Sequence, residues 1–141
     1  MAALRNTIQR DLVLQAVRDL KNHPTPEEVY EYIHKKHPTI SKGTVYRNLN
    51  VLVEQGQLYR VSMPDSANRV DHTLTPHYHF ACRICKTVED VDLPYMEGIM
   101  EKEIRNLEGF EVEGHELIFS GVCPACREKR KETKEMKGET A

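Results

Sequence analysis

The stretch His77-Tyr-His-Phe-Ala-Cys-Arg-Ile-Cys85 decides how the second half of this 141-residue chain folds. It ends in a Cys-x-x-Cys pair, and the other two cysteines form a second pair, Cys123-Pro-Ala-Cys126. The two-residue gap lets both sulfurs of a pair reach one ion from a tight turn, and two pairs supply the four thiolates of a tetrahedral zinc site. We therefore expect a structural Zn²⁺ that leaves no open position for a substrate, bound by Cys82, Cys85, Cys123 and Cys126.

Three other uses of cysteine pairs fit less well. A thioredoxin-type dithiol belongs at the strand-to-helix turn of an early βαβ unit, whereas Cys123-Pro-Ala-Cys126 lies near the C-terminus. A zinc deaminase needs His-x-Glu followed by Pro-Cys-x-x-Cys, but His115 and Glu116 are adjacent and Pro124 lies inside its pair. Disulfides are rare in reducing compartments, and Met1–Arg10 has two arginines and no apolar run of a signal peptide. We expect a cytoplasmic protein.

Length and charge point to a small protein with two unlike halves. A chain of 141 residues suits one large domain or two small ones, and no apolar stretch approaches the roughly 20 residues of a membrane helix. The net charge of −2 divides unevenly. Residues 1–60 carry nine Lys/Arg and six Asp/Glu, giving +3, and residues 61–141 carry eleven and sixteen, giving −5. The basic half can face phosphates, and the acidic half can hold cations.

Three amphipathic helices are predicted before residue 57. The first spans about residues 7–20, where apolar residues recur at helical spacing. The second begins at Thr25, which forms a capping box with Glu28. The third begins at Ser41, another candidate N-cap, and ends at Gly56, the residue type that often terminates helices.

Two strand-like runs follow at 57–63 and 69–74, joined by a turn-rich segment. Three helices and a hairpin form the order of a winged helix-turn-helix domain, whose third helix enters the major groove of DNA. Its first turns offer phosphate donors, a base-edge reader and an aromatic ring that can contact a thymine methyl. A plain helical bundle with a polar surface is the alternative. The predicted DNA contacts are Arg5, Lys42, Thr44, Tyr46, Arg47 and Asn48.

The remaining residues predict a mixed unit. Residues 77–92 alternate as strands do, 94–107 read as a helix, and 111–122 read as another strand. The zinc would tie the end of that last strand to the start of the unit, as small β-rich domains require.

The fold class is therefore α+β in two domains. We expect a winged helix-turn-helix domain over residues 1–74, with a hinge at about 70–77, and a small α/β domain over residues 75–128. Residues 129–141 are charged and poor in apolar side chains, so we expect a helical stub and then a disordered tail.

A second metal site is predicted beside the first cysteine pair. His77 and His79 lie on one side of a strand, because side chains alternate faces. Asp71 lies six residues before His77, Asp90 lies eleven after His79, and His23 lies between the first two helices. Imidazole with carboxylate suits Fe(II), Mn(II) or Zn(II) better than Ca(II) or Mg(II).

The identity of the last ligand depends on strand register. A shift of one residue would present Glu89 in place of Asp90, because strand neighbours face opposite ways. The spacing from Cys85 favours Asp90.

Over nearly its full length the chain resembles the Fur family of metal-dependent repressors. The resemblance implies a winged-helix domain, an α/β dimerisation domain, and a homodimer on palindromic double-stranded DNA. It also implies the four-cysteine zinc and a regulatory Fe²⁺ or Mn²⁺ at the hinge. The motifs that carry it are His23-Pro-Thr, Ser41-Lys-Gly-Thr-Val-Tyr-Arg-Asn-Leu, Arg69-Val-Asp71, His77-Tyr-His-Phe-Ala-Cys-Arg-Ile-Cys85 and Gly121-Val-Cys-Pro-Ala-Cys126.

Within that family the chain looks closest to the peroxide-sensing PerR branch. By resemblance the regulatory ligands are His23, Asp71, His77, His79 and Asp90, and iron sensors typically carry Glu where the two aspartates stand. In the peroxide-sensing branch Fe(II) reacts with hydrogen peroxide and a ligand histidine is oxidised; His23 and His77 match those positions. A further site of iron sensors has lost its ligands here to Pro76 and Tyr78, so we expect His115 to be a structural or a surface residue.

The resulting interpretation is a metal-dependent transcriptional repressor, not an enzyme, with hydrogen peroxide as its signal. An iron- or zinc-sensing repressor of metal-uptake genes is the first alternative. A zinc-containing metalloenzyme is a remote one, because no nucleophile motif such as Gly-x-Ser-x-Gly is present. A pure interaction module is the third.

Overall fold

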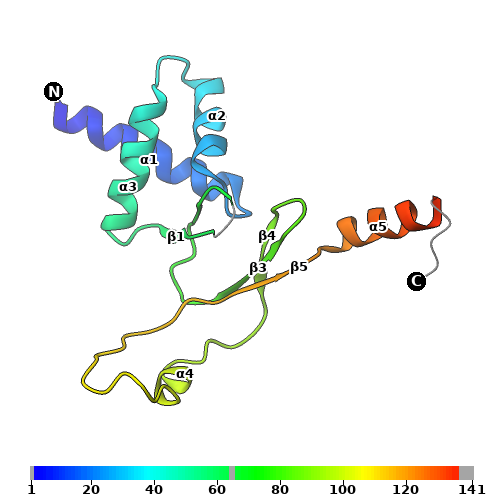
Figure 1. Cartoon of the computed structure of the whole chain (residues 1–141). Helices are drawn as coiled ribbons and strands as arrows, with labels where there is room; N and C mark the ends of the chain where they lie inside the picture. The colour runs from blue at the N-terminus through cyan, green and yellow to red at the C-terminus, as the bar shows by residue number, and fades with distance from the viewer. Residues whose placement is uncertain (1, 64–65, 137–141) are drawn as a thin grey trace. The chain divides into compact units, whose positions relative to one another are not determined.

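A computed structural model describes residues 2–63 and 66–136, and the chain folds into two compact units that divide between Thr75 and Pro76. The first unit is mostly helical, and the second is built on a three-stranded sheet (Figure 1). Within the described ranges, no helix is both long and apolar enough to cross a bilayer.

The first unit has the element order of a winged helix. Helices α1 (Ala2–Leu20), α2 (Pro26–Lys36) and α3 (Lys42–Glu54) are followed by strands β1 (Tyr59–Val61) and β2 (Arg69–Asp71), which pair antiparallel. Helix α1 begins earlier than the apolar pattern predicts, and both strands are shorter than the runs 57–63 and 69–74.

Local capping explains where two of these helices begin. The Thr25 hydroxyl accepts a hydrogen bond from the backbone N–H of Glu28 at 3.2 Å, and the Ser41 hydroxyl accepts one from the N–H of Thr44 at 3.1 Å. Each bond satisfies one of the N–H groups that a helix start leaves without an intrahelical partner. Gly56 adopts a φ of +73° just after α3, which a residue with a Cβ adopts only with strain. Both predicted caps are confirmed.

One apolar core joins all three helices to the hairpin. Leu58, before β1, and Val70, in β2, are buried with the helical side chains, so α3 is held against both α1 and β2. The core therefore supports the buried face of α3 and leaves its other face to solvent. The core consists of Val13, Ala16, Val17, Val29, Ile33, Ile40, Val45, Leu49, Leu52, Leu58 and Val70.

The second unit is a mixed sheet in the order β4-β3-β5 (Figure 1). Strand β3 (Tyr78–Cys82) pairs antiparallel with β4 (Val88–Val91) and parallel with β5 (Ile118–Gly121). The parallel pairing brings the ends of β3 and β5 together, so the cysteine pairs that follow them are neighbours.

Two predicted elements of this unit are much shorter than expected. The helix predicted over 94–107 is reduced to α4 (Ile99–Lys102), and the strand predicted over 111–122 is reduced to β5. Gly98 adopts a left-handed φ of +74° directly before α4, which interrupts a longer helix. Ile99 is 59% exposed and Ile104 42% exposed, so these apolar side chains do not pack into a core that would stabilise a longer helix.

Helix α5 (Pro124–Met136) begins inside the second cysteine pair. The region from 129 to 136, expected as a stub and a disordered tail, is helical. Lys131 Nζ lies 3.7 Å from Glu128 Oε1, three residues earlier on the helix. Residues 137–141 of the predicted tail lie outside the described residues.

Replacing the cap of the DNA-facing helix tests how far α3 depends on local structure. We expect Ser41→Ala to lower the free energy of unfolding by about 1 kcal/mol, because the N–H of Thr44 loses its acceptor. Ser41→Asn retains a capping oxygen and should stay close to the wild type. Urea unfolding followed by helical circular dichroism measures both, and equal stability of the alanine and asparagine variants would contradict the capping role.

Candidate metal centres and DNA-facing helix

Backbone pairing brings the four cysteines together. Cys82 ends β3 opposite Gly121 of β5, and the N–H of Arg83 donates to the carbonyl of Gly121 at 2.9 Å. The first pair lies on a turn in which the N–H of Lys86 donates to the Cys82 carbonyl at 3.0 Å, and Lys86 itself has a φ of +67°. The second pair follows β5 at the start of α5.

The sulfur geometry fits one tetrahedral cation. All four Sγ atoms lie within 4.8 Å of one another, and those of Cys85 and Cys123 are 3.7 Å apart. A tetrahedral site with Zn–S bonds of about 2.3 Å has sulfurs separated by about 3.8 Å. The four cysteines carry no disulfide, and three of them are buried. The donor set and the spacing therefore fit Zn²⁺.

The thiols of this cluster have unequal acidities. N–H groups, first that of Cys123, whose nitrogen lies 3.4 Å from the Cys82 sulfur, lower the pKa of Cys82 to about 5. Burial and then the neighbouring sulfurs raise the pKa of Cys126 to about 12. Four thiolates at this separation would repel one another, and a bound cation would offset that repulsion.

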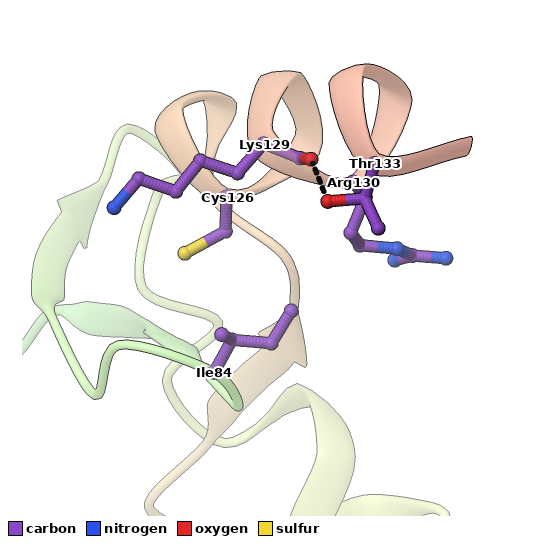
Figure 2. A pocket seen from close by; sticks show the side chains of 5 residues that line it. All are labelled: Ile84, Cys126, Lys129, Arg130 and Thr133. Atoms are coloured by element: carbon purple, nitrogen blue, oxygen red, sulfur yellow. Dashed lines mark hydrogen bonds between the residues drawn. The ribbon is translucent and has the colours of Figure 1, made fainter. Parts of the chain in front are cut away.

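One side of the cluster borders a groove of about 300 Å³. Figure 2 shows Lys129 and Ile84 on either side of Cys126, with Arg130 and Thr133 further along α5. The Thr133 hydroxyl donates to the Lys129 carbonyl at 2.9 Å, which ties that side chain to the helix. Cys126, the cysteine that lines this groove, is only 5% exposed, whereas Cys85 is the exposed member of the cluster.

Three of the predicted regulatory ligands lie together in the second unit. His79 pairs directly with Asp90 across β3 and β4, and Phe80 pairs with Glu89. Cross-strand partners share a face, so Asp90 and not Glu89 lies on the histidine side. Asp90 Oδ1 is 3.0 Å from His77 Nε2 and 3.6 Å from His79 Nε2, and the two imidazole rings are 4.4 Å apart. The register thus agrees with the sequence spacing.

The other two predicted ligands lie together in the first unit. His23 Nε2 is 3.1 Å from Asp71 Oδ2, and both side chains are buried. Asp71 ends β2, and its other carboxylate oxygen accepts the N–H of Thr73 at 2.9 Å.

His23 sits at the end of an unusual turn. Three successive residues, Lys21, Asn22 and His23, have φ values of 52°, 48° and 56°, a region that residues other than glycine adopt at a cost. The turn is attached to β2: Arg69 Nη1 donates to the His23 carbonyl at 2.9 Å, and the N–H of Val70 donates to the Pro24 carbonyl at 2.9 Å. The backbone thus holds His23 beside the wing strand.

His115 belongs to a hydrogen-bonded group on the other side of β3. Its Nε2 lies 2.6 Å from the Tyr78 hydroxyl, and its Nδ1 lies 2.5 Å from Glu101 Oε1. Tyr95 stacks on the imidazole with ring centroids 4.7 Å apart. The hydrogen bond to His115 lowers the pKa of Glu101. These contacts attach α4 and the segment before β5 to the fully buried Tyr78.

Helix α3 presents most of its predicted DNA contacts to solvent. Lys42, Tyr46 and Arg47 are exposed, Thr44 is half-buried, and Arg5 is exposed on α1. Asn48 is 7% exposed, and its side-chain amide donates to the Thr44 carbonyl at 2.9 Å. A helix turns by 100° per residue, so the residue after an exposed arginine can face the core. Asn48 stabilises the helix in this structure and lies outside the exposed set.

The sequence does not identify Glu27, Glu101 and Tyr95 as contacts of the candidate residues discussed above. Glu27 contacts Lys42 and Tyr46 from α2, and the other two contact His115. Each contact joins residues at least 14 positions apart, so no local pattern signals it.

Comparison with known proteins places the whole arrangement in one family. Residues 1–120 match the family model described as the Ferric uptake regulator family. The peroxide-responsive repressor PerR of Staphylococcus epidermidis is 31% identical over 128 residues, covering 91% of this chain and 85% of that protein. The crystal structure of the Campylobacter jejuni peroxide stress regulator superposes with a TM-score of 0.71 at 31% identity, covering 87% of this chain and 92% of that one.

A solved zinc uptake regulator complexed with zinc and DNA is also similar, with a TM-score of 0.64 at 25% identity, covering 87% of this chain and 83% of that one. The family match spans both units and every motif that carries the metal-ligand candidates except the second cysteine pair. This chain therefore belongs to the Ferric uptake regulator family of metal-responsive transcriptional regulators.

Proposed function

We propose that this protein is a metal-dependent, DNA-binding transcriptional repressor that responds to hydrogen peroxide through its regulatory metal site. The pairing of His79 with Asp90 carries the proposal, because it puts an aspartate, not the neighbouring glutamate, beside both histidines. Aspartate at this position and at Asp71 resembles the peroxide-sensing branch, and the similar PerR of Staphylococcus epidermidis is a peroxide-responsive repressor.

The regulatory metal would be held by both half-sites. His23 and Asp71 offer two ligands, and His77, His79 and Asp90 offer three; neither set alone fills the coordination sphere of Fe²⁺ or Mn²⁺. The mixed nitrogen and oxygen donors suit those ions, and Zn²⁺ would occupy the separate four-cysteine site. A metal that needs ligands from both units favours one relative orientation of the units, so DNA affinity becomes metal-dependent.

Bound ferrous iron would supply the electron that activates hydrogen peroxide for attack on an imidazole. The chain determines which imidazole is reached. The His77 side chain is 19% exposed, against 4% for that of His79. The turn at Lys21–His23 holds the other proposed target beside Asp71. Oxygen added to either ring weakens it as a ligand, and the preference for the DNA-competent orientation is lost.

DNA binding follows from the first unit and dimerisation from the second. Members of this family bind DNA and act as dimers, and the similar zinc uptake regulator was solved with DNA. We propose that Arg5, Lys42, Thr44, Tyr46 and Arg47 face a palindromic operator, in the cytoplasm where the DNA lies. Seven large apolar side chains of the second unit are exposed, which suits a homodimer interface: Ile84, Leu93, Ile99, Ile104, Phe110, Val112 and Phe119.

The first alternative is an iron- or zinc-sensing repressor of metal-uptake genes that does not respond to peroxide. It uses the same fold and ligands and differs only in the oxidation step. The enzyme alternative is set aside, because the relatives of this chain are transcriptional regulators.

Replacing one cysteine should destabilise the second unit and leave the stability of the first unit unchanged. We expect Cys123→Ser to abolish zinc binding and to lower the free energy of unfolding of the second unit by several kcal/mol, because a buried ligand of a closed site is lost. The helical unit shares none of these ligands and should keep its own transition. Zinc content by atomic absorption and unfolding followed by hydrogen exchange measure the two effects. Full zinc occupancy in the variant would contradict the four-cysteine site.

The register of β4 predicts which neighbouring acid binds the regulatory metal. We expect Asp90→Asn to weaken Mn²⁺ binding at least tenfold, since removing even an outer-shell partner of a metal ligand costs about 10–100-fold. Glu89→Gln removes the same charge one residue away, on the opposite face, and should bind Mn²⁺ as the wild type does. Titration calorimetry of zinc-loaded protein decides between them, and equal losses in both variants would reject the register argument.

Mass spectrometry of peroxide-treated protein tests the sensor proposal. With iron bound, one equivalent of hydrogen peroxide should add an oxygen to peptides containing His23 or His77 and reduce DNA binding. Peptides containing the exposed His37 should stay unmodified, and protein loaded with Mn²⁺ should be unchanged throughout. Asp90→Glu should retain metal-dependent DNA binding and oxidise more slowly. Unmodified His23 and His77 with undiminished DNA binding would leave the iron- or zinc-sensing alternative.

A further inference from the structure

The DNA-facing residues of α3 are held by a carboxylate from the neighbouring helix. Glu27 Oε2 lies 2.8 Å from Lys42 Nζ and accepts a hydrogen bond from the Tyr46 hydroxyl at 3.0 Å, and Oε1 accepts one from Lys42 Nζ at 3.1 Å. The Lys42 ammonium also lies 5.5 Å from the ring centroid of Tyr30 on α2. One acidic side chain thus engages two of the residues expected to contact DNA.

These contacts are exposed, so stability does not explain them. The side chains of Lys42 and Glu27 are 51% and 49% exposed, and solvent-exposed ion pairs contribute little to folding. The core below α3 already fixes the helix. Glu27 instead determines the direction of the Lys42 and Tyr46 side chains and reduces the positive charge that α3 presents to DNA.

Protonation agrees with this geometry. Hydrogen bonds from Lys42 and then Tyr46 lower the pKa of Glu27, and the hydrogen bond to Glu27 raises the pKa of Lys42. Desolvation and then Glu27 raise the pKa of Tyr46. At neutral pH the group is therefore a carboxylate, an ammonium and a neutral phenol, with the lysine charge largely balanced.

Glu27 changes what each residue offers to DNA. The Tyr46 hydroxyl already has an acceptor, so its ring carbons are the part left for a base edge such as a thymine methyl. A phosphate that approaches Lys42 meets the Glu27 carboxylate as well, and like charges repel. Glu27 therefore weakens contact between Lys42 and the phosphate backbone of any DNA sequence. It does not weaken contact between the Tyr46 ring and a matching base.

We propose that Glu27 is a specificity-determining residue that suppresses binding of the α3 surface to arbitrary DNA and orients the Tyr46 ring toward bases. This inference rests on the proposed DNA-binding function and assigns a role to a residue outside the contact set. It predicts that an acidic residue at this interface improves discrimination at the expense of general affinity.

The test compares two duplexes and four proteins. The specific duplex is selected from a random library by the wild-type, zinc- and manganese-loaded full chain, and the second is a scrambled version of it. The variants are Glu27→Gln, which removes the charge; Tyr46→Phe, which removes only the hydroxyl; and Glu31→Gln. Glu31 is exposed one turn further along α2, so its substitution controls for the change in net charge.

Glu27→Gln should bind the scrambled duplex about three- to tenfold more tightly, because Lys42 gains a phosphate contact. For the same reason, the slope of log binding constant against log salt concentration should steepen by about one per protomer. Its preference for the selected duplex should fall at least threefold. Tyr46→Phe should lose affinity for the selected duplex alone, and Glu31→Gln should change both affinities alike.

An unchanged preference in Glu27→Gln overturns the inference and leaves the proposed function intact, as does Tyr46→Phe binding both duplexes like the wild type. Failure of the wild-type protein to select any sequence overturns both.

Discussion

Strand β3 is the constraint on which both metal sites depend. Within its five residues it pairs with β4, which places Asp90 opposite His79, and with β5, which places Gly121 opposite Cys82. Tyr78 anchors the strand on its other side through His115. A slip of one residue would turn the histidines away from Asp90 and separate the cysteine pairs at once. One strand register therefore fixes the positions of the proposed regulatory ligands of this unit and of the four cysteines together.

The two candidate ligand sets of the second unit differ in donor atoms and in exposure, as the roles proposed for them require. The cysteine cluster is built from sulfur alone, is mostly buried, and leaves no position for a further ligand. The set around Asp90 combines nitrogen and oxygen, includes an exposed carboxylate, and is incomplete within its own unit. A closed soft site suits permanent structure, whereas an open, harder one suits reversible binding and chemistry.

How much the sequence predicts depends on whether the determining contacts are local. The caps at Thr25 and Ser41 rest on spacings of a few residues and are present in the structure. The structure also brings the two cysteine pairs together and pairs Asp90, not Glu89, with His79. The helix over 94–107 fails because its apolar face has no core to bury against. The burial of Asn48 depends on packing, and the contacts of Glu27 join two helices, so no local pattern reveals either.

The left-handed turn at Lys21, Asn22 and His23 makes this region sensitive to damage at a single ring. Each such residue costs about 1–2 kcal/mol relative to an ordinary conformation. That cost is offset by what the turn holds: the imidazole beside Asp71 and the carbonyls bonded to Arg69 and Val70. Removing the imidazole contact takes away part of the offset while the strain stays. The turn is therefore a strained segment whose contacts offset its strain. We expect a change of one atom in the His23 side chain to loosen the backbone that supports the wing.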